Sequence, residues 1–367
     1  MRYVLYNVEN KTKEEGTMTT VYLIRHAEAE GNLYRRAHGH YDATITDNGY
    51  RQIAALAKRF EHEHIDAVYS SDLTRTQTTA LALTRVHGLP LHLEPRLREV
   101  GVGVWEDRTW TWLAKFDRDR LIAFNTDAGN WRVEGGETME QVRERVMDAL
   151  REIIAAHPNE TVALFSHGMA LRLLVGTLRS LSIQEIDGTG HGENTAVTKL
   201  EADENGIRVV YAMDASHLSE ELTTLHKQLW TRNKGGIEPG IWFAPDEGGE
   251  GRFAVMQEDD AVGAVAVGPC ESGAAEIKAF RLGEAARHRG LGVRLVGQAI
   301  SCARSRGCDT LRITLPRDDA AALERLMQYG FAATRETPRD VVLEKYFGRG
   351  EGYRTARFDE AWAERNG

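Results

Sequence analysis

Four side chains that can bind or attack an anion follow apolar runs in this chain. Arg25 and His26 end one run that is typical of a buried strand, and His167 ends a second. Arg75 comes a few residues after a third. Arginine binds anions through a fixed fork of donors, and a neutral imidazole can act as a nucleophile or a base. Because active sites collect at strand ends in open α/β sheets, we expect the four side chains to lie together.

The sequence around these positions resembles the histidine phosphatase superfamily, in its phosphoglycerate-mutase-like group. The first motif is the run 25–28, with Ala27 where glycine is commoner, and the distant members are Arg75 and His167. Further matching runs lie, in the family's order, at residues 45–52, 97–99, 103–106 and 135–138. The resemblance covers roughly residues 18–215 and implies a three-layer α/β/α domain.

The resemblance implies attack on a phosphomonoester through a phosphohistidine. Arg25 and Arg75 would neutralise the phosphoryl oxygens by bidentate hydrogen bonds. His26 would attack phosphorus with one ring nitrogen while a hydrogen bond to the other fixes the tautomer. We expect the two guanidinium groups to lower the pKa of His26 by charge repulsion, so that the ring is neutral near neutral pH. His167, at a helix start, would donate to an equatorial oxygen, and Asn32 would add a donor.

The resemblance assigns the protonation of the leaving alkoxide to Glu99. An acid must be protonated, which a pocket partly walled by Trp105 favours and the nearby arginines oppose. The same carboxylate would act as base when water hydrolyses the phosphohistidine, so the mechanism needs no metal ion. We expect Trp105 also to contact the substrate.

Short apolar runs alternate with helical patterns over the first 215 residues. This alternation predicts a largely parallel sheet with helices on both faces. The helical patterns lie at residues 47–60, 75–86, 137–156 and 169–181. Thr46 and Thr138 are suited to cap two of these helices. We expect the segment 107–134, rich in Trp, Phe, Arg and Asp, to form a helical cap that selects the substrate.

Composition indicates a cytoplasmic enzyme of more than one domain. The 367 residues exceed one typical domain, and 42% hydrophobic residues can build sizeable cores. A formal charge of −9 disfavours nucleic acid or an anionic membrane as the main partner, and no apolar run is as long as a membrane span. Cys270, Cys302 and Cys308 have no metal-ligand spacing, and we expect reduced thiols that pack in the interior.

A second α/β unit follows a change of pattern near residue 217. Strand patterns at 252–257, 262–267 and 276–281 lead into a basic, glycine-containing turn, and a helical pattern at 293–304 and a strand pattern at 310–315 come next. A glycine turn at a helix start can hold a pyrophosphate on backbone N–H groups. The unit, over about residues 252–346, resembles a GNAT acetyltransferase. The resemblance implies acetyl-CoA as ligand, bound by Arg287, Arg289, Gly290 and Gly292.

This second unit departs from the GNAT pattern where acetyl transfer would occur. Leu326 stands where the family usually has a tyrosine that protonates the thiolate, and Asp319 stands where it has asparagine. The usual paired N-terminal helices are not evident, although helical patterns at 219–230 or 353–365 can supply one. We infer acetyl-CoA binding and leave acetyl transfer open.

The sequence predicts five segments and leaves three functions open. The segments are an extension at 1–17, a histidine phosphatase domain at 18–217, a linker with a helix at 218–250, a GNAT-like domain at 251–347 and a tail, helical in pattern, at 348–367. The leading function is a metal-independent phosphatase acting on a small phosphorylated metabolite through a phosphohistidine, with an attached acetyl-CoA-binding domain for which acetyl transfer stays open as a second activity. The alternatives are a phosphoglycerate mutase and a phosphatase regulated by a non-catalytic, acetyl-CoA-sensing domain. A homo-oligomer also stays open.

Overall fold

The first sheet brings the carboxyl ends of its parallel strands to one edge. The computed structural model describes residues 17–186, 189–228, 240–246, 249–287 and 289–366, so all but Thr17 of the expected extension lies outside the described residues. The strands are β1 (Thr19–Arg25), β2 (Ala67–Ser70), β3 (Leu91–Leu93), β4 (Thr161–Ser166), β5 (Val197–Asp203) and β6 (Gly206–Asp214). Their order is β3-β2-β4-β1-β5-β6. Strands β1 to β4 are parallel, β5 is antiparallel to β1, and β6 is antiparallel to β5. This confirms the largely parallel sheet.

Helices cover both faces of this sheet because its strand residues alternate between two cores. On β1, Val21 and Leu23 belong to one buried cluster, whereas Tyr22 and Ile24 belong to the other. Helices α6 (Met139–Ala156) and α7 (Gly168–Leu178) pack in the first cluster. Helices α2 (Asp47–Phe60) and α3 (Thr74–His87) pack in the second. The domain therefore has the expected three layers.

Two helix starts are capped as the sequence predicts. The side chain of Thr46 accepts a hydrogen bond from the Gly49 N–H at 3.0 Å, and Thr138 accepts one from the Gln141 N–H at 3.2 Å. Each bond satisfies a donor that the helix itself leaves unpaired. The caps fix where α2 and α6 begin.

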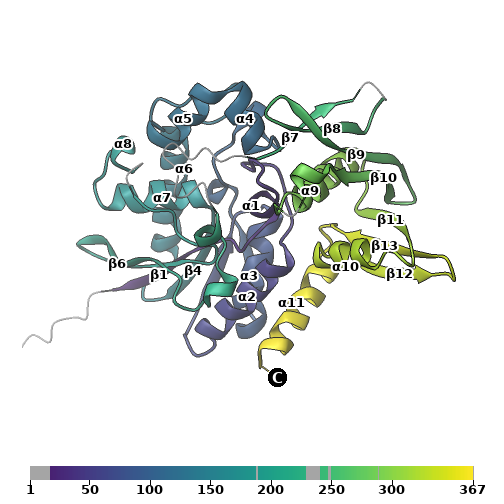
Figure 1. The fold of residues 1–367 in the computed structure, drawn as a ribbon. Coiled ribbons are helices and arrows are strands. Elements are labelled where there is room, and N and C mark those ends of the chain that lie inside the picture. The colour runs from purple at the N-terminus through teal and green to yellow at the C-terminus, as the bar shows by residue number, and fades with distance from the viewer. Residues whose placement is uncertain (1–16, 187–188, 229–239, 247–248, 288, 367) are drawn as a thin grey trace, which may run out of the picture.

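A helical cap lies beside the sheet, as the sequence predicts. It contains α4 (Trp110–Phe116) and α5 (Arg118–Thr126), which Figure 1 shows next to the second domain. Trp105, Phe124 and Trp131 pack against one another beneath it. Two further short helices are α1 (Glu30–Tyr34), directly after the first motif, and α8 (Ile183–Ile186).

The second domain has a seven-stranded sheet. It also contains helix α9 (Gly292–Ser305) and helix α10 (Ala320–Gln328). Its strands are β7 (Trp242–Pro245), β8 (Arg252–Gln257), β9 (Asp260–Glu271), β10 (Ala274–Leu282), β11 (Thr310–Pro316), β12 (Ala332–Glu336) and β13 (Asp340–Tyr346). They run in the order β12-β13-β11-β10-β9-β8-β7. Strand β7 lies within 218–250, so the sheet begins inside the segment that the sequence assigns to the linker.

The parallel strands β10 and β11 pair only at their starts. Ala274 pairs with Thr310, and the last paired residues are Glu276 and Arg312. Both strands then continue for several residues without pairing to each other. The sheet therefore opens between them on the side where the glycine turn precedes α9.

The prediction of a helix at 219–230 is wrong for the residues of this segment that the structure describes. Residues 220–222 and 225–227 form two separate 3₁₀ turns, η3 (Glu220–Leu222) and η4 (Leu225–Lys227), and residues 229–230 lie outside the described residues. The carboxylate of Glu193 accepts the N–H groups of residues 224–226, and Gln52 donates to the carbonyl of Leu222. These tertiary bonds take up backbone groups that a continuous helix would need.

The C-terminal helix α11 (Glu351–Asn366) returns to the first domain. It packs against α2 and α3, where Phe358 is buried, and Arg357 pairs with Asp47 at 2.6 Å (Figure 1). The tail is helical, as its pattern indicates. It does not supply an N-terminal helix of the second unit, because its apolar face is covered by the first domain.

The expectation of three reduced cysteines is wrong. Cys270, on β9, forms a disulfide with Cys308, which follows α9, and only Cys302 is free and buried. The sequence gives no sign of this pairing, because the two thiols are brought together by strand pairing in the second sheet. Cys270 pairs with Ala275 on β10, and Cys308 lies two residues before β11.

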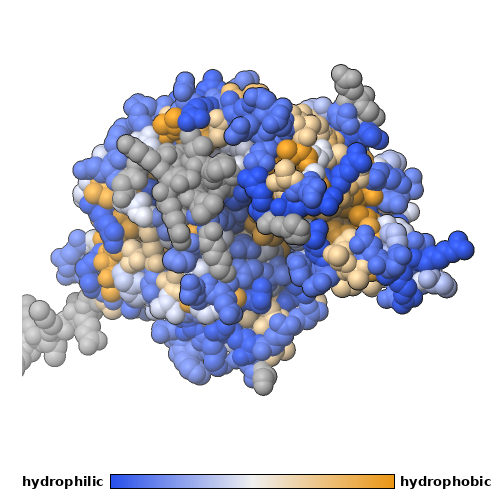
Figure 2. Space-filling view, viewed as in Figure 1, coloured by the Kyte–Doolittle hydropathy of each residue, from blue (hydrophilic) through white to orange (hydrophobic). Residues whose placement is uncertain are grey.

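The face of the molecule in Figure 2 is mainly hydrophilic, with apolar residues in separate patches. None of the helices in the described part of the chain has both the length and the apolar character that crossing a membrane takes. Within the described ranges, no three His, Cys, Asp or Glu side chains gather as metal ligands do.

Candidate active site

The strand ends bring together the residues that the sequence singles out. In β1 and β4, Arg25 pairs with Ser166, so His26 and His167 both follow the same sheet edge. Their ring centroids are 5.2 Å apart. Arg75, in the first turn of α3, has its side chain at the same edge and contacts His167.

His26 has the tautomer that a nucleophile needs. Its Nδ1 lies 2.8 Å from the carbonyl oxygen of Ala27, so Nδ1 carries the proton and donates. The lone pair is then on Nε2, and His26 lines the cavity described below. The N–H of Ala27 in turn donates to Thr79, which fixes the turn that follows β1.

His26 is held neutral by its surroundings. Burial is the largest cause that lowers its pKa well below the ordinary value, and the charges of Arg75 and Arg25 lower it further. The sequence predicts the direction of this shift and the arginine contribution. It misses that desolvation dominates, because burial depends on the packed fold.

Arg75 is anchored by carbonyl groups and is almost fully buried. Its NH1 donates to the carbonyl of Tyr41 at 2.9 Å and its NH2 to that of Gly39 at 2.8 Å. The loop that carries these carbonyls is itself held by Glu106, whose carboxylate accepts the N–H groups of residues 39–41. Glu106 therefore positions Arg75 through the loop, a role that its place in the 103–106 motif does not reveal.

Arg25 differs from Arg75 in keeping a buried donor unpaired. Its NH1 donates to the carbonyl of Gly192, whereas its Nε has no hydrogen-bond partner in the described structure. Burial is the main cause that lowers the pKa of this guanidinium. A bound oxyanion would supply the acceptor that Nε lacks.

His167 lies behind the catalytic cavity and does not line it. Its Nε2 is 2.7 Å from the hydroxyl of Ser71, and its Nδ1 accepts from Arg75 Nε at 3.2 Å. Both ring nitrogens are therefore engaged, and burial, followed by the charge of Arg75, lowers the pKa of His167 well below its ordinary value. This differs from the expected direct bond to a phosphoryl oxygen, because the sequence cannot show which partners the ring finds.

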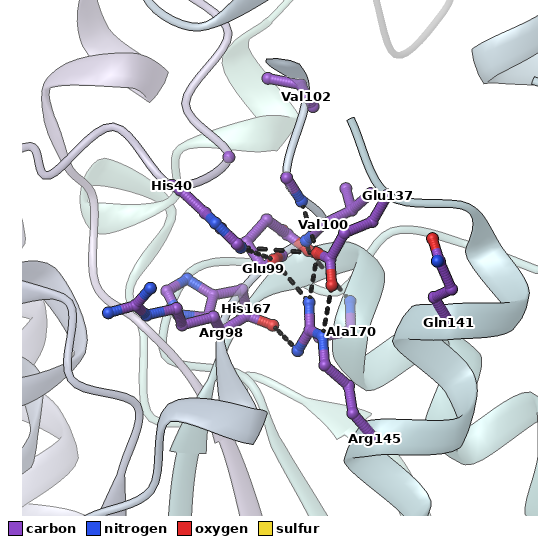
Figure 3. Close-up of polar contacts among 12 residues, drawn as sticks. His40, Arg98, Glu99, Val100, Val102, Glu137, Gln141, Arg145, His167 and Ala170 are labelled. Atoms are coloured by element: carbon purple, nitrogen blue, oxygen red, sulfur yellow. Dashed lines mark hydrogen bonds and ion pairs between the residues drawn. The ribbon is translucent and has the colours of Figure 1, made fainter. Parts of the chain in front are cut away.

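Glu99 lies at the start of α7. Its carboxylate accepts the N–H of Met169 at 3.1 Å and that of Ala170 at 3.0 Å (Figure 3). It also accepts the N–H of Val100. The two α7 donors are among the N–H groups that a helix start leaves unpaired. Since Glu99 also lines the cavity, it is within the site and oriented by backbone groups.

The backbone around Glu99 is fixed by Arg145 of α6. Its guanidinium donates to the carbonyls of Arg98 and Glu99 at 2.7 and 2.8 Å (Figure 3). It also donates to the carbonyl of Arg96 at 2.7 Å. Glu137 forms two bonds with the same guanidinium. Burial alone would raise the pKa of Glu137, but contacts with His40 and Arg145 hold it well below its ordinary value. The 135–138 motif therefore acts on the site through Arg145.

A cavity of about 190 Å³ opens from His26 toward the cap. Asn32 lines it, as expected. Trp105 is the exception to the expected substrate contacts: it is only 1% exposed, and its indole N–H donates to Asp117. The aromatic side chains of the lining are Trp110 and Phe124, and Trp105 supports Phe124 from behind.

Several lining residues were not singled out from the sequence. Arg172 of α7 and His191 lie on one side, and burial lowers the pKa of His191 to about 3. Leu225 and Gln228 close the cavity from the segment that the Glu193 carboxylate holds. Their positions come from long-range contacts, so local sequence gives no signal for them.

The glycine turn of the second domain has the features that a CoA pyrophosphate requires. Gly290 has a φ of +69°, and a Cβ added there would meet nothing within 4 Å. A Cβ on Gly292 would collide with the hydroxyl of Tyr329. The exposed side chains of Arg287 and Arg289 flank the turn, and within the described part of the chain no side chain caps the start of α9. With the opening between β10 and β11, these residues fit acetyl-CoA.

Comparisons with known proteins match both halves of the chain. The family model of the histidine phosphatase superfamily (branch 1) matches residues 21–215, and that of the acetyltransferase (GNAT) family matches residues 217–331. The chain is 37% identical over 166 residues to a protein named probable phosphoglycerate mutase GpmB from Cronobacter sakazakii, covering 45% of this chain and 76% of that protein.

Solved structures show the same fold for the first domain. YhfR of Bacillus stearothermophilus has a TM-score of 0.53 and 29% identity, covering 55% of this chain and all (100%) of that one. A protein named mycobacterial hydrolase 1 has a TM-score of 0.51 and 25% identity, covering 54% of this chain and 99% of that one. Both resemblances found in the sequence are confirmed.

Proposed function

This chain belongs to the histidine phosphatase superfamily, and from that premise we propose that it hydrolyses a small phosphorylated metabolite through phospho-His26. The observation that carries the proposal is the geometry of His26. Its Nδ1 is held as a donor by the Ala27 carbonyl, its charge is suppressed, and its Nε2 is left for attack beside the buried Arg75 and the half-buried Arg25.

In the first step, the Nε2 lone pair of His26 forms a bond to phosphorus while the bond from phosphorus to the ester oxygen breaks. Arg25 and Arg75 neutralise the charge on the three phosphoryl oxygens. Glu99 gives its proton to the leaving alkoxide. In the second step Glu99 takes a proton from water, the water oxygen bonds to phosphorus, and the P–N bond electrons return to His26.

A phosphoglycerate mutase is the second candidate, favoured by the 37% identity to GpmB. A mutase would return the phosphoryl group to a substrate hydroxyl instead of to water. Against it, Arg98 next to Glu99 pairs with Asp72 and is not among the residues that line the cavity. Activity that depends on added 2,3-bisphosphoglycerate would favour the mutase.

The second domain is proposed to bind acetyl-CoA at Arg287, Arg289, Gly290 and Gly292. When bound, the thioester supplies an activated acetyl group. The departures at Leu326 and Asp319 persist in the fold, where Leu326 is buried and Asp319 caps α10, so acetyl transfer and acetyl-CoA sensing both stay candidates. A cytoplasmic location also stays a proposal, against which the Cys270–Cys308 disulfide weighs, since such bonds persist in oxidising compartments.

The test is metal-free hydrolysis of p-nitrophenyl phosphate and a panel of phosphorylated metabolites. We expect steady turnover in EDTA and acid-labile phosphate trapped on the wild-type protein, with neither in His26→Ala. Turnover that leaves no phosphoenzyme after quenching, or a wild type inactive on every phosphoester, would contradict the proposal.

A further inference from the structure

One wall of the phosphatase cavity rests on the second domain. The lining includes seven residues of the segment 29–38, which contains α1. Helix α1 has only five residues, too few to hold its own place by backbone hydrogen bonds. It contacts α9 of the second domain, and Figure 1 shows the two helices side by side.

The first contact is a buried ion pair between the domains. Arg304 of α9 makes two bonds to Glu30, with NH1–Oε2 at 2.8 Å and NH2–Oε1 at 3.0 Å. The side chains are 13% and 5% exposed. Burial alone would raise the pKa of Glu30, but the guanidinium outweighs it and lowers that pKa. Removing either partner would leave a buried charge uncompensated.

The second contact holds a residue that itself lines the cavity. Arg36 donates from NH1 to Gln298 at 3.0 Å and from NH2 to Ser301 at 3.2 Å, both on α9. Asp107 of the first domain accepts from Arg36 and from the Ser301 hydroxyl. Since Arg36 is only 7% exposed, these partners fix its direction.

The third contact is apolar and close. Tyr34 packs on Gly297, where an added Cβ would lie 2.5 Å from the Tyr34 Cβ. Tyr34 belongs to the hydrophobic core of the second domain, although it lies in the first. Helical spacing places four contacting residues, 297, 298, 301 and 304, on one face of α9. This face therefore packs against the cavity wall.

We propose that Arg304, Ser301 and Gln298 are positioning residues of the phosphatase. They hold segment 29–38 in the shape that contacts the part of the substrate outside the phosphoryl group. The second domain is thereby a structural component of the first domain's substrate site. This inference rests on the proposed phosphatase function.

The proposal separates two parts of the cavity. Arg25 and His26 are held by a strand end and loops of the first domain, and the 39–41 loop that anchors Arg75 is held by Glu106. Helix α9 reaches this phosphoryl subsite through an indirect contact, from Arg304 to the hydroxyl of Tyr41. The wall at 29–38 instead rests on α9 through all three contacts described above. Loss of α9 contacts should therefore weaken substrate binding more than binding of a phosphate mimic.

The experiment compares Arg304→Met with Arg306→Met in the full chain. Arg306 follows α9 and is as buried as Arg304. It bonds the carbonyls of Val267 and Gly268 and pairs with the exposed carboxylate of Glu250, all outside the first domain. For p-nitrophenyl phosphate, we expect KM to rise about tenfold in Arg304→Met with kcat within about twofold. The inhibition constant of orthovanadate should stay within about twofold of wild type, and Arg306→Met should match wild type in each value.

A double-mutant cycle and hydrogen exchange make the outcome decisive. Glu30→Gln combined with Arg304→Met should raise KM no more than the worse single variant, because the two side chains act as one pair. The backbone amides of residues 29–38 should exchange hydrogen faster in Arg304→Met than in wild type. In Arg306→Met their exchange rates should equal those of wild type. A fall in kcat with KM unchanged, or unchanged exchange, would overturn the positioning role. If wild type turns over no phosphoester, the proposed function fails, and the exchange result still decides whether α9 positions the wall.

Discussion

The phosphatase site and the glycine turn of the second domain are built in opposite ways. His26, Arg75 and His167 are 6%, 1% and 0% exposed, and each has ring or guanidinium nitrogens bound by the protein. Arg287 and Arg289 are exposed, and among the described residues Arg287 donates to the carbonyl of Leu282 and Arg289 to the side chain of Gln257. The first site is preorganised by side chains that the fold encloses. The second depends on backbone shape, with exposed charges around it.

This difference predicts where substitutions will matter. In an enclosed site, one substitution removes a group and also leaves its buried partners unsatisfied, so effects are large. At an exposed turn, water replaces a lost side chain, so effects are small. The predictions below go from the most enclosed position to the most exposed.

His26→Ala should reduce phosphatase kcat by about ten-thousand-fold or more, because no other group can carry the phosphoryl intermediate. The measurement is the initial rate with p-nitrophenyl phosphate together with phosphoenzyme trapping. His92→Ala is the matched control, since His92 stacks on Tyr69 and lies outside the cavity lining. A trapped phosphoenzyme in His26→Ala would show that another residue is the nucleophile. The enclosed site would then not be more sensitive to substitution than the exposed turn.

Arg145→Met should reduce kcat by roughly tenfold to a hundredfold, because the loop carrying Glu99 loses three carbonyl bonds. The fall should be larger for glycerol phosphate than for p-nitrophenyl phosphate, because an alkoxide needs the acid and a nitrophenolate does not. Arg151→Met is the control, since Arg151 lies on the same helix and pairs only with exposed Asp148. An equal loss on both substrates would show that Arg145 stabilises the fold without positioning the acid.

The free energy of unfolding should decrease as the pH is lowered, because of the two buried histidines. His26 and His167 have depressed pKa values in the folded state, so below about pH 6.5 the unfolded chain binds protons that the folded chain does not. Each would then cost about 1.4 kcal/mol of unfolding free energy per pH unit. Urea titrations between pH 7 and 5 measure how steeply the free energy of unfolding changes with pH. The His26→Gln variant should show a shallower slope. An unchanged slope in this variant would show that His26 protonates in the folded protein.

The sequence anticipates what depends on local pattern. The helix expected at 47–60 is α2 to the residue, and the four strand-end side chains meet because parallel strands share an edge. Their order and residue types carry enough chemistry to identify the family before any coordinates.

The sequence does not anticipate what depends on packing between distant segments. Trp105 and Trp110 look alike in sequence, yet only Trp110 lines the cavity, because Trp105 is buried against Trp131 and donates its indole N–H to Asp117. The 219–230 segment has a helical pattern but gives its backbone groups to Gln52 and Glu193. No local pattern encodes such partners.

Arg289→Ala should weaken acetyl-CoA binding by only a few-fold, since its guanidinium is exposed and screened and the backbone turn stays in place. Gly292→Val should weaken it much more, because a side chain there would displace Tyr329 and close the start of α9. Calorimetry with acetyl-CoA measures both, and Arg335→Ala, exposed on β12, is the charge-matched control. If Arg289→Ala abolished binding while Gly292→Val did not, the turn would act through its side chains, and the two sites would be built more alike than their exposure indicates.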